Sequence, residues 1–116
     1  MKVAELLHTI DSPRVSFEIV PPKRGSSLSH IIEIVDGLSG FDPLYVDVTS
    51  HSAQVYYEEQ NDGSWRRHVK RKRPGTLGMC AAIKGRFGIE TVPHLLCKGF
   101  TREESEDALI ELNYLG

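Results

Sequence analysis

The feature that most constrains the fold of this chain is the regular alternation of strand-like and helix-like segments. Short runs rich in β-branched and aromatic residues alternate three times with segments whose apolar residues recur at helical spacing. This order and spacing are typical of a parallel sheet built from βα units. After a short amphipathic helix near residues 3–10, the predicted strands cover 14–22, 44–51 and 89–96, and the predicted helices cover 28–38, 76–88 and 102–115.

The ends of the predicted helices carry recognisable capping residues. Ser27 and Thr76 are candidate N-caps, and Gly88 is a candidate for the position that ends the second of these helices. Thr101 followed by Glu104 forms a capping box pattern that opens the last helix.

The length of the chain limits the fold further. The 116 residues correspond to one domain, 1–116, whereas a closed (β/α)8 barrel takes about 250 residues. We therefore expect the N-terminal part of an α/β barrel of the TIM type, with about three βα units. A complete small α/β sandwich is the alternative that periodicity leaves open.

Composition excludes several classes of protein. The sequence has no apolar run of membrane-spanning length and no pattern of a signal peptide. Cys80 and Cys97 form no C-x-x-C pair, so we expect two reduced thiols, no metal site and a cytoplasmic location.

Alternation along the predicted strands places three polar residues at one end of the sheet. Side chains of a strand point to opposite faces in turn, and each strand, over roughly 14–20, 44–49 and 90–95, has one mainly apolar face. Near their carboxyl ends, the other faces present Glu18, Thr49 and His94. Ligands of parallel α/β folds bind at this end. Each residue alone is ordinary in a strand, but their shared face favours a shared site.

A basic run lies in the long polar loop predicted over 52–75, which has a turn signal at 61–63. The run "RRHVKRKR" (66–73) holds six of the 14 basic residues, which leaves 8 basic against 16 acidic residues elsewhere. A solvated loop is one interpretation, and steering of an anionic ligand is another. A nucleic-acid patch is not expected, because only Trp65 lies beside the run as a stacking aromatic.

Four stretches resemble the N-terminal portion of the methylenetetrahydrofolate reductase family. They read "SFEIVPPK", "FDPLYVDVTSH", "RKRPGT" and "CAAIKGRFGIETVPHLLCKGFTREESEDALIELNYLG". The most specific parts are S-F-E-x-x-P-P and V-P-H-L-x-C-x-G-x-T-x-x-E, in the order and βα context of the family.

The resemblance implies a barrel that binds FAD and uses NAD(P)H to reduce 5,10-methylenetetrahydrofolate to 5-methyltetrahydrofolate. Glu18 takes the position of the family's general acid. Thr49, with Ser50 and His51 after it, and His94 take positions beside the flavin. The family's later L-R-G-D segment is not among the 116 residues, so the chain alone is expected to bind FAD poorly and to be inactive. The resemblance also allows a homo-oligomer of the complete enzyme. The rival hypothesis is a non-enzymatic α/β module that binds an anionic partner through 66–73.

Overall fold

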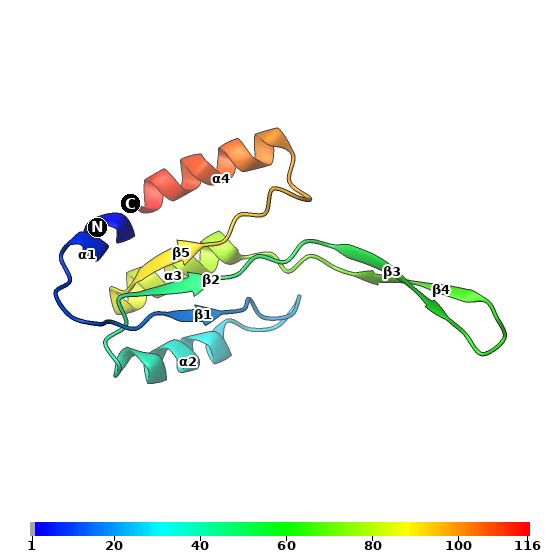
Figure 1. Cartoon of the computed structure of the whole chain (residues 1–116), viewed down its shortest axis with the longest axis horizontal. Helices are drawn as coiled ribbons and strands as arrows, with labels where there is room; N and C mark the ends of the chain where they lie inside the picture. The colour runs from blue at the N-terminus through cyan, green and yellow to red at the C-terminus, as the bar shows by residue number, and fades with distance from the viewer. Residues whose placement is uncertain (1) are drawn as a thin grey trace.

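The computed structural model describes residues 2–116 and contains a small parallel sheet covered by helices (Figure 1). The strands of this sheet lie in the order β1–β2–β5, and both neighbouring pairs are parallel. The elements along the chain are α1 (Val3–His8), β1 (Phe17–Ile19), α2 (Ser29–Ser39), β2 (Tyr45–Val48), β3 (Gln54–Glu59), β4 (Trp65–Lys70), α3 (Thr76–Phe87), β5 (Glu90–Pro93) and α4 (Arg102–Leu115).

The prediction of a parallel α/β sheet is confirmed. The strands are shorter than the sequence pattern indicates, but backbone hydrogen bonds prolong their pairing. The amide of Thr49 donates to Ile19 at 3.0 Å, and the amide of His94 donates to Val48 at 2.9 Å. The three strands form an open sheet rather than a closed barrel.

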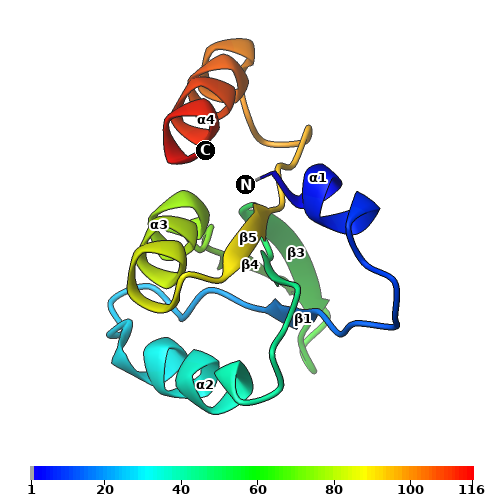
Figure 2. The ribbon, with the colours of Figure 1, turned by 90° about the vertical axis from the view of Figure 1, so that its left-hand side faces the viewer.

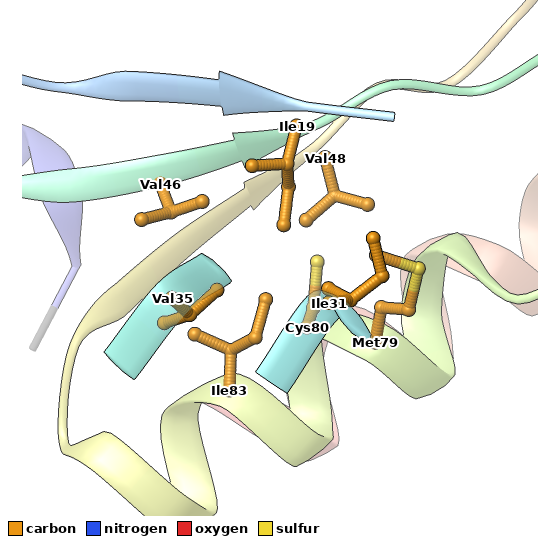
Figure 3. Close-up of a cluster of buried hydrophobic side chains, with 8 residues drawn as sticks. All are labelled: Ile19, Ile31, Val35, Val46, Val48, Met79, Cys80 and Ile83. Atoms are coloured by element: carbon orange, nitrogen blue, oxygen red, sulfur yellow. The ribbon is translucent and has the colours of Figure 1, made fainter. Parts of the chain in front are cut away.

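Helices α2 and α3 pack on one face of the sheet (Figure 2). Alternation explains this: β2 turns Val46 and Val48 toward the helices, and both are fully buried. The buried cluster between sheet and helices consists of Ile19, Ile31, Val35, Val46, Val48, Met79, Cys80 and Ile83 (Figure 3). None of the helices in residues 2–116 is long and apolar enough to span a membrane.

One of the predicted N-caps is confirmed and two are wrong. Thr101 caps α4 in a capping box with Glu104. The N-cap of α3 is Gly75, whose φ of 107° favours glycine, and the hydroxyl of Thr76 instead donates to the carbonyl of Thr49. The N-cap of α2 is Leu28, while the Ser27 hydroxyl accepts from the amide of Ser29 at 3.1 Å.

The helix α3 ends as predicted. Gly88 has a φ of 67°, in the left-handed region, and its amide donates to the carbonyl of Lys84 at 2.9 Å. A residue with a Cβ atom is disfavoured there, so this glycine stops the helix and turns the chain toward β5.

The segment 52–75 is not an irregular loop, which corrects the sequence prediction. It contains an antiparallel hairpin of β3 and β4 that projects away from the sheet and helices (Figure 1). The predicted turn at 61–63 is its tip, with Gly63 at a φ of 78°. Residues with strong strand propensity, including Val55, Tyr57 and Trp65, outweigh the polar character of this segment.

Candidate functional site

The candidate site lies on the face of the sheet that α2 and α3 leave uncovered. In the register of the sheet, Glu18 is paired with Asp47, and Asp47 is paired with Val92. His94 lies two residues beyond Val92, so alternation puts its side chain on the same face. Three ionisable side chains from neighbouring strands therefore meet near the carboxyl end of the sheet.

The imidazole of His94 lies between two carboxylates. Its Nε2 atom is 4.0 Å from Oε2 of Glu18 and 3.7 Å from Oδ1 of Asp47. The Glu18 side chain is 60% exposed and that of Asp47 is 23% exposed. Glu18 is thus the carboxyl group that can reach a ligand, whereas Asp47 is held closer to the sheet.

Thr49 is at the same end of the sheet but is buried, with 8% of its surface exposed. Its Oγ1 atom is 3.2 Å from Nε2 of His51, and its carbonyl accepts a 2.9 Å hydrogen bond from the Thr76 hydroxyl. The structure therefore brings the predicted residues together in two pairs, Glu18 with His94 and Thr49 with His51.

Two pockets at this end are lined by residues that follow β2 and β5. Ser50 and His94 line a pocket of about 190 Å³ together with Thr76 and Phe100. Ser50 and His51 line a second pocket, of about 300 Å³, whose other residues include Lys70 and Lys98.

Glu18 borders a third, open pocket of about 660 Å³. Arg73 reaches the same pocket, and its guanidinium donates to the carbonyl of Pro21 at 3.2 Å. A pocket of about 730 Å³ lies at the opposite end, where Leu44 and Ile89 enter the strands. Because ligands of parallel α/β folds bind at the carboxyl ends of strands, the pockets near Glu18 and His94 are the better candidates.

The basic run does not form a single patch. On the hairpin, Arg66 and Arg67 follow one another and so point to opposite faces. Lys72 lies 4.3 Å from the centre of the Phe100 ring, and Arg73 binds the carbonyl of Pro21. The charges of residues 66–73 are therefore divided among separate surroundings.

Sequence reasoning missed two residues of this region. Asp47 lies on the face that alternation predicts to be polar, two residues before Thr49, which is the last polar residue of that face. Arg73 is the last residue of a basic run, and no local signal in the sequence indicates that its guanidinium donates to the carbonyl of Pro21, in the segment that follows β1.

The fold and the site define a class: a parallel α/β protein of βα units whose ionisable groups gather at the carboxyl ends of its strands. The family model described as methylenetetrahydrofolate reductase matches residues 2–116, and the chain belongs to this family. It is 32% identical over 90 residues to 5,10-methylenetetrahydrofolate reductase of Salmonella typhimurium, an alignment that covers 78% of this chain and 25% of the relative. It is 28% identical over 99 residues to the enzyme of the same name in Buchnera aphidicola, over 85% of this chain and 28% of the relative.

The chain thus spans about a quarter of the length of the curated relatives it matches. The matched part includes the open face, the pockets and the hairpin, since the family model covers all residues that the structure describes.

Proposed function

We propose that the protein is a 5,10-methylenetetrahydrofolate reductase that uses FAD and NAD(P)H and that residues 1–116 are the front part of its (β/α)8 barrel. Membership of the family supports the reaction class. We assign the reaction to this site because Glu18 and His94 lie together at the carboxyl ends of β1 and β5.

The residues around this site fit a flavin by the chemistry of their side chains. Ser50, His51 and His94 offer hydroxyl and imidazole groups that can bind the polar edge of a flavin ring, while Leu95 and Phe100 add apolar contacts. The pocket of about 190 Å³ accommodates only part of FAD, since pockets for drug-sized ligands measure about 300–1,000 Å³. We assign Ser50, His51 and His94 to cofactor binding, and Thr49 to the same group through its contact with His51.

Bound FAD would supply the hydride chemistry, and Glu18 would supply the proton. Its exposed carboxyl group can hold a proton and donate it to a nitrogen of the folate. His94 positions this carboxyl group by proximity, and Asp47 in turn lies 3.7 Å from His94. The buried Thr49 fixes the end of β2 beside them through its contacts with His51 and Thr76.

The test separates the two half-reactions in protein expressed from the complete reading frame. Glu18→Gln keeps the shape of the side chain but removes the transferable proton. We expect folate reduction to slow by about 10²–10⁴-fold, as is usual for a lost general acid, while NAD(P)H oxidation by the flavin changes little.

Stopped-flow absorbance of the flavin follows each half-reaction separately. Glu33→Gln on the outer surface of α2 is the matched control and should leave both rates unchanged. Equal slowing of both half-reactions by Glu18→Gln would show that Glu18 positions the flavin instead of donating a proton.

A further inference from the structure

The chain returns from the hairpin to α3 through residues 71–75, here called the return segment. This segment contacts the loops that follow all three strands of the sheet. The residues contacted are Pro21 after β1, His51 after β2 and Phe100 after β5. Arg73 makes the first two contacts, through its guanidinium and its backbone amide, and Lys72 makes the third.

Proline interrupts the hydrogen bonds between β1 and β2 shortly after Ile19. The last of these bonds runs from the amide of Thr49 to the carbonyl of Ile19 at 3.0 Å. In the regular pattern of a parallel pair, the amide of residue 21 would next donate to Thr49, and the carbonyl of residue 21 would accept from residue 51. Residue 21 is a proline and has no amide hydrogen, so the pattern cannot continue.

The two carbonyls at this point have side-chain donors instead. The hydroxyl of Thr76 donates to the carbonyl of Thr49 at 2.9 Å, and the guanidinium of Arg73 donates to the carbonyl of Pro21 at 3.2 Å. The amide of Arg73 also donates to the carbonyl of His51 at 3.2 Å, in an isolated antiparallel bridge. Arg73 therefore connects the loop after β1 to the loop after β2 where the regular pairing stops.

The backbone of Arg73 is itself restrained. A residue before a proline favours an extended conformation, and Pro74 follows Arg73. Gly75 is the N-cap of α3, and Met79 and Ile83 fix this helix in the buried cluster. The guanidinium of Arg73 therefore extends from a backbone that is bonded to His51 and tied to a packed helix.

We propose that Arg73 is a positioning residue for the general acid, an inference that rests on the proposed function. Pro21 lies three residues after Glu18 and is fully buried, and Arg73 lines the same pocket as Glu18. By holding the carbonyl of Pro21, Arg73 fixes the course of the chain just beyond Glu18. It thereby sets where the carboxyl group of Glu18 lies relative to the folate, without acting on the folate itself.

The kinetic test uses protein expressed from the complete reading frame. Arg73→Met keeps the aliphatic stem and removes the donors. We expect kcat for folate reduction to fall by about 10–100-fold, because a misplacement of about 1 Å can cost about 10²-fold. KM for folate and the reduction of the flavin by NAD(P)H should change little. Arg71→Met, which removes the same group from an exposed position two residues earlier, is the matched control and should behave as the parent.

A double-mutant cycle separates positioning from direct binding. If Arg73 acts through Glu18, Arg73→Met should cost little more once Glu18→Gln has removed the acid. Losses that multiply, a higher KM with an unchanged kcat, or equal slowing of both half-reactions would each overturn the proposal. If Glu18→Gln itself reduces folate at the parent rate, the proposed function fails. If Glu18→Gln slows folate reduction and Arg73→Met does not, only the positioning role fails.

Hydrogen exchange followed by mass spectrometry tests the contact without any measurement of activity. Peptides that cover residues 17–27 should exchange faster in Arg73→Met than in the parent and in Arg71→Met, because the loop after β1 opens more readily without its donor. Peptides from α4 should exchange equally in all three proteins. Unchanged exchange over 17–27 in Arg73→Met would show that Arg73 does not hold this loop and would overturn the proposal.

Discussion

The hydrogen bond between Thr76 and Thr49 links the helix α3 to the end of β2 where the candidate site lies. The Thr76 hydroxyl donates to the carbonyl of Thr49 at 2.9 Å, and both residues are buried, at 9% and 8% exposure. Thr76→Val replaces the hydroxyl with a methyl group of similar shape. The carbonyl of Thr49 then loses this donor in a place that water reaches poorly.

The cost follows from the burial of this carbonyl. Leaving a buried acceptor unsatisfied costs about 1–3 kcal/mol. Unfolding entropy of about 2.1 cal/mol/K per residue gives about 240 cal/mol/K for the 116 residues. Each kcal/mol therefore lowers Tm by about 4 °C, so we expect Thr76→Val to lower Tm by about 4–12 °C.

Thermal and urea unfolding, followed by far-ultraviolet circular dichroism, measure this loss. Thr9→Val is a control of the same chemistry, because the Thr9 hydroxyl also donates to a backbone carbonyl, that of Leu6 at 2.8 Å, but is exposed. Water can replace that bond, so Tm should stay within about 2 °C, the equivalent of a surface change below 0.5 kcal/mol. Equal losses in the two variants, or none in Thr76→Val, would refute the argument from burial.

Three further predictions concern single side chains. Burial raises the pKa of the Cys80 thiol, whereas Cys97 is exposed. A thiol reagent at neutral pH should therefore label only Cys97 in the native protein and both cysteines in urea. Fast labelling of both thiols in the native protein would contradict this. The backbone amide and the hydroxyl of Thr101 hold the pKa of Glu104 below its ordinary value. Because a lowered pKa adds stability that is lost as pH falls, the start of α4 should fray below about pH 4.5. Glu104→Gln should abolish this decrease in helicity at acid pH. If Asp47 positions His94, Asp47→Asn should slow folate reduction, but less than Glu18→Gln does, and should leave Tm unchanged. A variant that reduces folate at the rate of the parent would exclude this role of Asp47.

The parallel sheet could be predicted from sequence because the alternation of apolar and polar residues along each strand indicates which face is buried. Val46 and Val48 alternate with Asp47, and this alone indicates one apolar and one polar face. The hairpin could also have been recognised, since Val55 and Tyr57 alternate before a turn with Gly63. The many charged residues of "RRHVKRKR" indicate a solvated loop, and this signal outweighs the alternation in the sequence.

The details of the site depend on contacts between distant segments, which no local pattern shows. The carbonyl of Thr49 accepts its hydrogen bond from a hydroxyl of α3, 27 residues further on. The anchoring of Arg73 depends on a carbonyl 52 residues before it. Alternation could therefore predict the face of Glu18 and His94 but not which polar groups would be buried.

Under the proposed function, the two faces of the sheet separate stability from chemistry in this part of the protein. On β2, Val46 and Val48 are fully buried and fix the strand against α2 and α3, and Asp47 between them is held in place by their packing. Truncating a buried aliphatic side chain of this kind costs about 0.5–5 kcal/mol, depending on its size. Glu18 is not a member of that buried cluster, and its side chain is 60% exposed, so its replacement should change stability by less than about 0.5 kcal/mol. A change at Glu18 that abolishes activity while leaving the fold intact is therefore evidence about chemistry, whereas a change at Val46 or Val48 is not.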